Sequence, residues 1–297
     1  MIVLLGASGY VGTAFRRFFE RSNIRYRPLG RKQFNYYDSD QLSAALASCR
    51  PSFVINCAGY TGRPNVDACE DHKAECLAAA AVLPALVAQA CDRIAVPMGH
   101  VSSGCIYTGN GPNDCGFNEE DPPNFTFRQN NCSFYSGCKA LGEEVLEPFE
   151  NCFIWRLRIP FDDTDSTRNY ISKLLRYERL LEARNSLSQL DEFVAACYQC
   201  YRNSLPQGIY NLTNTGSVTT SEVVELIQKH RLADRQFSFF SDEQEFMQIA
   251  AKTPRSNCVL DNGKALAAGL KLTSVHEALE RCLMNWQSVG RVNTKAA

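Results

Sequence analysis

The 297-residue sequence has no excess of charge of either sign, because 31 Lys and Arg residues stand against 32 Asp and Glu residues. Nucleic-acid binding needs a concentrated basic footprint, so this balance argues against a nucleic-acid partner. The sequence also has no unbroken run of 18 apolar residues, and no basic-then-apolar leader follows Met1. From these absences we expect a cytoplasmic protein that does not cross a membrane. With 45% hydrophobic residues, the chain can still build a full globular core.

Cysteine, by contrast, is abundant, with 14 residues scattered through the chain. A chain of this size does not need disulfides to hold its core, so most of these thiols should be small buried apolar residues. Cys197 and Cys200 form the single CxxC pair, and no second pair accompanies it. A structural zinc site needs four such ligands, so we expect no bound metal.

Short apolar runs alternate with helical patterns through the first half of the chain. Strands are predicted at 2–5, 26–29, 53–57, 93–102 and 152–157, and helices at 11–22, 40–48, 73–91 and 136–149. This alternation predicts an α/β fold with a doubly wound parallel sheet, because each parallel crossover needs a helix. Residues 1–157 would form a dinucleotide-binding Rossmann domain. Residues 158–297 would form a smaller C-terminal substrate-binding domain, part of which returns to the Rossmann sheet, with helices predicted at 169–181 and 220–230 and a strand at 208–212.

A glycine-rich turn follows the first predicted strand and opens the first helix, with the sequence Gly6-Ala-Ser-Gly9-Tyr-Val-Gly12. Glycines at this place let the backbone approach a pyrophosphate, which then sits on the helix N-terminus. The GxxGxxG spacing is typical of short-chain dehydrogenases, although a tight turn without a ligand can have it too. The predicted cofactor-binding residues in this turn are Gly6, Ser8, Gly9, Tyr10, Val11 and Gly12.

The second strand ends at Gly30-Arg31-Lys32. An acidic residue there would hold the ribose hydroxyls of NAD, whereas an arginine favours the phosphate of NADP. We therefore expect NADP, leave NAD open, and keep a solvated surface charge as the alternative role for Arg31. Asp38 could reach the adenine. The chain can also pass close under the cofactor after the third strand, at Ala58, Gly59 and Tyr60.

Tyr135-Ser-Gly-Cys-Lys139 is a YxxxK motif at the start of a predicted helix. The i,i+4 spacing puts both side chains on one helical face. The lysine charge can then lower the tyrosine pKa, so that the phenol passes a proton to a carbonyl oxygen. Ser103 ends the preceding strand, where its hydroxyl can hydrogen-bond the same oxygen. The glycine turn, the serine and YxxxK occur in the order and spacing of a reductase.

Taken together, these motifs resemble the extended short-chain dehydrogenases, in the branch of dTDP-4-dehydrorhamnose reductase and GDP-L-fucose synthase. The sequence is most similar to the plant-type bifunctional UDP-4-keto-6-deoxyglucose 3,5-epimerase/4-reductases. The segments that carry the resemblance are 58–67, 69–73, 116–126, 168–173, 208–214 and 254–257. It implies an NADPH-dependent enzyme that converts a UDP- or dTDP-linked 4-keto-6-deoxy sugar to the L-rhamnose form. It leaves open whether the enzyme is a homodimer.

The resemblance also implies two epimerase residues, Cys105 in Ser-Gly-Cys-Ile and Lys173 in Asn-Tyr-Ile-Ser-Lys. A proton next to a ketone is acidic because its carbanion becomes an enolate. A thiol and a desolvated lysine can serve as the base and the acid, and which is which stays open. The resemblance further places Asn169, Arg255 and Asn257 near the nucleotide diphosphate or the sugar.

Three alternatives stay open: a 4-reductase without epimerase activity, an enzyme of the GDP-L-fucose synthase type, and a non-catalytic NADP-binding regulatory subunit. Cys105 and Lys173 argue against the first, and Lys173 in place of a histidine argues against the second. The Tyr135–Lys139 pair argues against the third. One departure from the family pattern is the run Ala78-Ala-Ala-Ala81, where relatives usually carry a helix asparagine that supports the proton relay. This run puts the efficiency of the reductase, or the helix geometry, in doubt.

Overall fold

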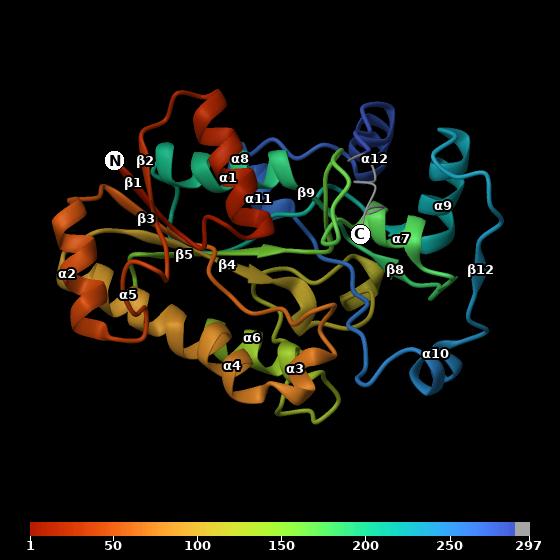
Figure 1. Cartoon of the computed structure of the whole chain (residues 1–297), viewed down its shortest axis with the longest axis horizontal. Helices are drawn as coiled ribbons and strands as arrows, with labels where there is room; N and C mark the ends of the chain where they lie inside the picture. Colours follow the sequence, from red (N-terminus) through yellow and green to blue (C-terminus); the bar gives the residue numbers. More distant parts are fainter. Residues whose placement is uncertain (289–297) are drawn as a thin grey trace, which may run out of the picture.

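A parallel six-stranded sheet forms the centre of the computed structural model, which describes residues 1–288 (Figure 1). Its strands are β1 (Ile2–Leu5), β2 (Tyr26–Leu29), β3 (Phe53–Asn56), β4 (Met98–Ser103), β5 (Cys152–Leu157) and β10 (Gly208–Asn211). They pair in the order β10-β5-β4-β3-β1-β2. Every residue of β1, β3 and β5 is buried, as in a sheet covered on both faces. The predicted doubly wound parallel sheet is therefore confirmed.

Helices cover both faces of this sheet (Figure 1). On one face, α1 (Tyr10–Arg21), α8 (Leu190–Arg202) and α11 (Gly263–Ala267) pack against alternate strand residues such as Ile2 and Leu4. On the other face, α2 (Ser39–Cys49) and α5 (Leu83–Arg93) pack against Val3 and Leu5. Helix α6 (Phe134–Glu144) lies on this second side, beside the short helices α3 (Ala68–Asp71) and α4 (Lys73–Leu77). The two-residue period of the strands thus separates the two cores.

The chain after β5 divides its residues between this sheet and a second core. Strand β10 and helices α8 and α11 join the sheet layers. The second core contains Phe161, Ile171, Val223 and Leu279. The elements outside the large sheet are β6 (Pro160–Phe161), α7 (Tyr170–Arg176), β7 (Arg179–Leu180), β8 (Arg184–Asn185), β9 (Ser188–Gln189), β11 (Val218–Thr219), α9 (Thr220–Lys229), β12 (Ser238–Phe239), α10 (Glu243–Ile249) and α12 (Val275–Met284). The domain boundary at residue 157 stays a prediction. The last residues of the predicted C-terminal domain, 289–297, lie outside the part of the chain that the structure describes.

The helix predicted at 73–91 runs from Lys73 to Arg93 as α4, a single π turn η1 (Ala78–Val82) and α5. This helix contains an 18-residue window of mean hydropathy 1.7, so by length and composition it is long and apolar enough to cross a membrane. A few polar residues interrupt the helix, so it contains no unbroken run of 18 apolar residues. In the fold, 56% of that window is buried against the rest of the protein, and core helices of soluble proteins reach the same length and hydropathy.

Two predicted helices differ in their ends. The helix predicted at 169–181 stops at Arg176, because Tyr177 is extended and Arg179–Leu180 pairs with β12. The helix predicted at 136–149 begins at Phe134, where the hydroxyl of Ser133 accepts a hydrogen bond from the backbone N–H of Ser136 at 3.1 Å. All 14 cysteines are free, and all are buried except Cys57, Cys115 and Cys132, as predicted.

Candidate active site

The glycine turn lies at the carboxyl end of β1, where the chain goes to β2 on one side and to β3 on the other. Ligands of doubly wound sheets bind at such a switch point. Gly6 has φ +76°, and a Cβ there would lie 2.4 Å from the backbone nitrogen of Ala58. At Gly12 a Cβ would lie 2.2 Å from the carbonyl oxygen of Gly6. Both positions therefore require glycine if the turn is to keep this tight shape.

The N-terminus of α1 is open toward a ligand. Gly9 caps α1 without a side-chain hydrogen bond, and its own N–H donates to the Gly6 carbonyl at 3.0 Å. Ser8 and Gly9 are exposed at the tip of the turn, and Val11 is half-buried behind them. Helix N–H groups without a capping side chain suit an anion, so this cradle fits a dinucleotide pyrophosphate.

The structure gives the other predicted cofactor residues different surroundings. Arg31 is exposed in the turn after β2. Asp38 caps α2: it accepts hydrogen bonds from the backbone of Gln41 and Asp40 and from the Gln41 side chain, and these bonds lower its pKa. The Tyr10 hydroxyl is buried next to the carboxylate of Asp162, and burial raises its pKa. Tyr10 can therefore serve a cofactor through its backbone.

After β3, the backbone of Ala58 lies directly under the glycine turn, as the close approach to Gly6 shows. Its N–H donates to the side-chain oxygen of Asn56 at 3.0 Å. Gly59 is exposed, and Tyr60 is half-buried against Cys69 and Cys76. These three residues after β3 therefore line the edge of the sheet at which the cradle opens.

Helix α6 holds the predicted reductase residues along one face. Tyr135, Lys139 and Glu143 follow at four-residue intervals, so they lie one above the other. Lys139 is 8% exposed, and its Nζ donates to the carbonyl of Val101 at 3.1 Å. At the end of β4, the hydroxyl of Ser103 accepts from the backbone N–H of Cys105 at 3.2 Å. The fold thus brings Ser103, Cys105, Tyr135 and Lys139 together.

Burial dominates the electrostatics of this cluster. It raises the pKa of Tyr135 well above its usual value, an effect that hydrogen bonding with Ser103 opposes. It lowers the pKa of Lys139 and raises that of Cys105, although the charges of Arg158 and Lys139 favour the thiolate. Side chains with shifted pKa values in one cleft are a mark of acid–base sites.

Glu143 and Arg156 fix the position of α6 against the sheet. The carboxylate of Glu143 accepts from Arg156 Nε at 3.0 Å and from Nη2 at 2.7 Å, and it also bonds the Ser102 hydroxyl. Arg156 lies on β5 and Ser102 on β4, so one carboxylate ties the helix to two strands. This buried pair sits one helical turn beyond Lys139.

Lys173 lies in a second cluster with two arginines. Burial, and then the charges of Arg168 and Arg255, lower its pKa. No hydrogen bond joins Cys105 to Lys173 anywhere in residues 1–288. An epimerase needs an acid and a base on opposite faces of a sugar ring, so two separate clusters are compatible with the predicted roles.

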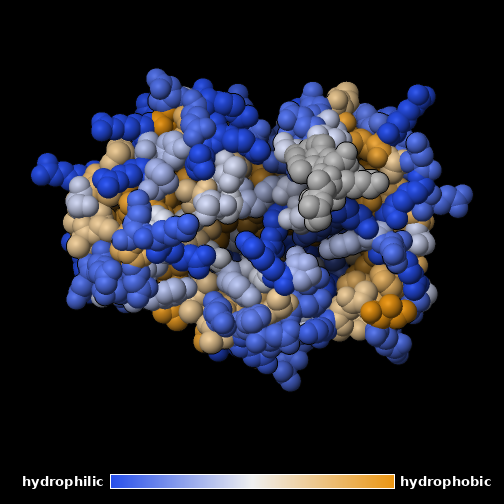
Figure 2. Space-filling view, in the orientation of Figure 1, coloured by the Kyte–Doolittle hydropathy of each residue, from blue (hydrophilic) through white to orange (hydrophobic). Residues whose placement is uncertain are grey.

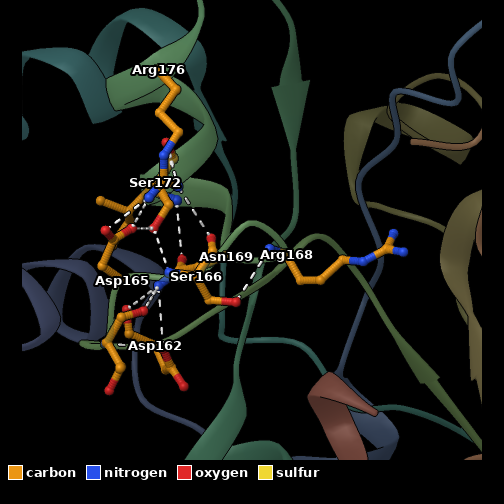
Figure 3. Close-up of polar contacts among 9 residues, drawn as sticks. Asp162, Asp165, Ser166, Arg168, Asn169, Ser172 and Arg176 are labelled. Atoms are coloured by element: carbon orange, nitrogen blue, oxygen red, sulfur yellow. Dashed lines mark hydrogen bonds and ion pairs between the residues drawn. The ribbon is translucent and has the colours of Figure 1, made fainter. Parts of the chain in front are cut away.

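Arg168 and Asn169 are neighbours with opposite orientations (Figure 3). Asn169 is fully buried: its Nδ2 donates to the carbonyls of Asp162 and Thr164 at 2.8 Å, and its oxygen caps α7. Arg168 extends away from this polar knot and donates to the carbonyl of Gly62 at 2.6 Å, in the loop after β3. The geometry favours an indirect role for Asn169, which holds the loop that carries Arg168.

Arg255 forms a two-pronged ion pair with Asp67, with both N–O distances at 2.7 Å. Burial opposes the charged form of Asp67, but the guanidinium outweighs it, and the pKa of Asp67 is lowered. A cavity of about 420 Å³ opens beside this pair, between α3 and the residues after α10. Asn257 lies farther along the same segment, where its side-chain oxygen accepts from Asn185 at 3.2 Å.

The visible face of the molecule is hydrophilic over most of its area and is hollowed near its middle (Figure 2).

Five buried polar residues close to the predicted reductase cluster are not among the predicted site residues: His100, Asn56, Glu143, Arg156 and Arg158. Asn56, His100 and Arg156 lie in the sheet, Arg158 directly follows β5, and Glu143 is on α6. For the three in the sheet, the available signal was a polar side chain inside a strand expected to be buried on both faces. Among residues 1–288, no group of three or more His, Cys, Asp or Glu side chains is arranged to hold a metal ion.

A protein-family model described as "RmlD substrate binding domain" matches residues 1–288. The chain is 35% identical over 283 residues to a bifunctional dTDP-4-dehydrorhamnose 3,5-epimerase/dTDP-4-dehydrorhamnose reductase of Arabidopsis thaliana, covering 93% of this chain and 90% of that protein. It is 34% identical over 285 residues to an Arabidopsis trifunctional UDP-glucose 4,6-dehydratase/UDP-4-keto-6-deoxy-D-glucose 3,5-epimerase/UDP-4-keto-L-rhamnose-reductase. That match covers 93% of this chain but only 41% of the trifunctional protein.

Solved structures share the whole architecture. The L780 UDP-rhamnose synthase of Acanthamoeba polyphaga mimivirus matches with a TM-score of 0.87 at 23% identity, over 96% of this chain and 98% of that one. A dTDP-4-dehydrorhamnose reductase of Bacillus anthracis, solved with NADP, matches with a TM-score of 0.80 at 19% identity, over 96% and 97%. At these identities the likeness bears on the fold, which is the same doubly wound sheet.

Proposed function

The chain belongs to the RmlD substrate-binding-domain family of extended short-chain dehydrogenases. We propose that it reduces a nucleotide-linked 4-keto-6-deoxy sugar with NADPH. The single observation that carries the proposal is the cluster of Ser103, Tyr135 and Lys139 at the same carboxyl edge of the parallel sheet as the glycine cradle. The relative with 35% identity, named as a dTDP-4-dehydrorhamnose reductase, supports the same reaction. The nucleotide is UDP or dTDP, since relatives of both kinds match.

NADPH, when bound, supplies the hydride that reduces the 4-keto carbon. The glycine cradle and the α1 N-terminus would hold its pyrophosphate, and Arg31 its 2′-phosphate. The NADP in the Bacillus anthracis reductase of the same fold supports this choice. On the protein side, the Tyr135 hydroxyl gives its proton to the 4-oxygen as that oxygen becomes a hydroxyl. Ser103 donates a hydrogen bond to the same oxygen and so stabilises its developing charge.

The proposal extends to epimerisation at carbons 3 and 5, with Cys105 and Lys173 as the proton-transfer residues. Removing a proton next to the ketone leaves an enolate, and returning a proton to the opposite face inverts that carbon. Cys105 adjoins the reductase cluster, while Lys173 stands with Arg168 and Arg255. Burial favours the neutral amine of Lys173, which can take up a proton, and the neutral thiol of Cys105, which can give one.

Arg168 and Arg255 are suited to the substrate diphosphate. Arginine forks pair with phosphate oxygens in two-pronged geometry, and Asp67 already holds Arg255 in that geometry. A phosphate would take the place of this carboxylate or share the guanidinium with it. The cavity next to the pair leaves room for the nucleoside.

One experiment separates the two reactions. Purified protein is given UDP-4-keto-6-deoxyglucose, and separately the dTDP sugar, in D₂O without NADPH, and deuterium at carbons 3 and 5 is read by NMR. NADPH is then added, its absorbance is followed, and the product sugar is identified. We expect exchange first and the L-rhamnose nucleotide afterwards.

Cys105→Ala should lose the inversion at carbons 3 and 5, and with it the L-rhamnose product, whereas Cys138→Ala, which removes a buried thiol on α6, is the matched control and should keep both. Reduction without exchange in the parent would leave a 4-reductase alone. If neither sugar leads to NADPH consumption, the proposal fails, and the GDP-sugar and regulatory alternatives are tested next.

A further inference from the structure

A histidine that the proposed mechanism does not use lies inside the sheet, against the face of α6. His100 is the third residue of β4 and is 1% exposed. It lies two residues before Ser102, so both side chains point to the same face, where Ser102 bonds Glu143. The Nε2 atom of His100 lies 3.4 Å from the Nζ atom of Lys139.

Asn56 determines which ring nitrogen of His100 carries the proton. The side-chain oxygen of Asn56 accepts the N–H of Ala58 at 3.0 Å, so its amide nitrogen must face His100 Nδ1, at 3.2 Å. An amide nitrogen can only donate, so Nδ1 must accept. Burial lowers the pKa of His100 well below its usual value, and the ring is neutral. Its one proton is then on Nε2, directed at Lys139.

The ammonium form of Lys139 would therefore face another donor. A charged Nζ has three hydrogens and no lone pair, whereas a neutral amine can accept from Nε2–H while still donating to Val101. The two arrangements differ by one hydrogen bond made or lost in a buried site, where such a bond has its largest effect.

Within residues 1–288, no other group near Lys139 fully offsets this preference. Cys105 on η2 (Gly104–Ile106) and Cys76 on α4 would stabilise the ammonium as thiolates. Burial raises the pKa of Cys105, and hydrogen bonding with Cys138 raises that of Cys76 to about 12, so both are neutral thiols. Glu143 on the same helix favours the ammonium, but its carboxylate is already bound to Arg156.

We infer that His100 is a positioning residue: Asn56 locks it with the proton on Nε2, and it thereby favours the neutral amine of Lys139 in the protein without cofactor. The inference rests on the proposed function only in that Lys139 belongs to the reductase cluster. It adds a buried His–Asn pair that sets the pH range in which Lys139 carries its charge beside Tyr135.

The first test reads the tautomer directly, in the resting protein without substrate. Long-range ¹H–¹⁵N NMR of histidine-labelled protein distinguishes the two ring nitrogens, and His100→Gln identifies the signal among four histidines. We expect the Nε2–H tautomer in the parent. In Asn56→Asp the new carboxylate should accept a hydrogen bond from Nδ1–H, which moves the ring proton from Nε2 to Nδ1. A parent with Nδ1–H or with a charged ring overturns the inference.

The second test follows the ammonium-to-amine transition of Lys139 by NMR of ¹³C-lysine-labelled protein, assigned with Lys139→Gln. In His100→Gln the new amide can turn its oxygen toward Lys139 and accept from the ammonium. We therefore expect the Lys139 transition in this variant at a pH about one unit or more above that in the parent. Asn56→Asp alone should raise the pH of the Lys139 transition, and it should raise that pH less when His100→Gln is also present. The difference separates the effect of the His100 tautomer from that of the added charge. Equal shifts in both backgrounds, or none in His100→Gln, would refute the inference. Neither readout depends on turnover, so a failed NADPH assay would count against the proposed function alone.

Discussion

Replacing Glu143 with leucine should lower the free energy of unfolding by about 3–5 kcal/mol, because it leaves a guanidinium buried without its counter-charge. The side chains of Arg156 and Glu143 are 2% and 8% exposed. The substitution removes the carboxylate that accepts from Nε and Nη2, and Arg156 keeps one partner, the Tyr107 hydroxyl at 3.0 Å. An exposed ion pair would contribute about 1 kcal/mol or less.

The double variant Glu143→Leu/Arg156→Met tests the physical reason. It removes the uncompensated charge together with its partner. The Ser102 hydroxyl loses its carboxylate partner, whereas the Tyr107 hydroxyl still donates to the carbonyl of Asp121 at 2.7 Å. Removing a whole buried pair is often close to neutral, so the double variant should be at least about 1 kcal/mol more stable than Glu143→Leu. A simple loss of favourable contacts would instead make the double variant the less stable one.

The assay is urea denaturation of the parent and of both variants, in low salt and in 1 M NaCl. Salt screens exposed charges, and buried pairs much less, so the loss in Glu143→Leu should persist at high salt. If the free energy of unfolding of Glu143→Leu is within about 1 kcal/mol of that of the parent, the reasoning is refuted, because a buried unpaired charge costs more than that. So would a double variant less stable than the single one.

Three further outcomes are expected. Tyr135→Phe should slow NADPH oxidation by about 10²–10⁴-fold while NADPH binding, read by fluorescence titration, stays close to that of the parent. Arg31→Ala should raise the KM for NADPH by about tenfold or more and leave that for NADH nearly unchanged, and equal effects on both would contradict a phosphate contact. Hydrogen bonding from Ser241, then Arg179, holds the pKa of Glu245 at about 2, so Glu245→Gln should be less stable than the parent at pH 7. Because the folded pKa is depressed, that difference should shrink as the pH falls below about 4.5 and vanish near pH 2.

The parts of the fold that sequence could predict are those with a local physical cause. Strands β1, β3 and β5 lie where unbroken apolar runs stand, since a strand covered on both faces has no polar side. The glycine turn was predictable because its backbone geometry excludes a Cβ. The Tyr135–Lys139 pair was predictable because helix periodicity alone puts it on one face.

What sequence could not predict depends on which distant segments meet. Glu143 meets Arg156 only because α6 lies across β4 and β5. Asn169 and Arg168 are adjacent in sequence, yet one is fully buried in a knot of carbonyls and the other reaches the Gly62 loop. Arg168, which was not predicted, is therefore better placed to contact a ligand than Asn169, which was predicted. Only the tertiary structure distinguishes the two residues.

The alanine run that departs from the family pattern has a packing cause in this chain. Ala80 is 2% exposed and lies in the π turn η1, where α6 approaches so closely that a Cβ at Gly142 would be 2.0 Å from the Ala80 carbonyl oxygen. Cys76 and Cys138 fill the rest of this contact, so little space is left for a larger polar side chain at the turn. The polar neighbour of Lys139 comes instead from the opposite side, as His100 of β4. The small side chain of Ala80 lets α6 pack closely against η1 through its backbone. On the other side of α6, Lys139 faces the sheet, where His100 is its polar neighbour.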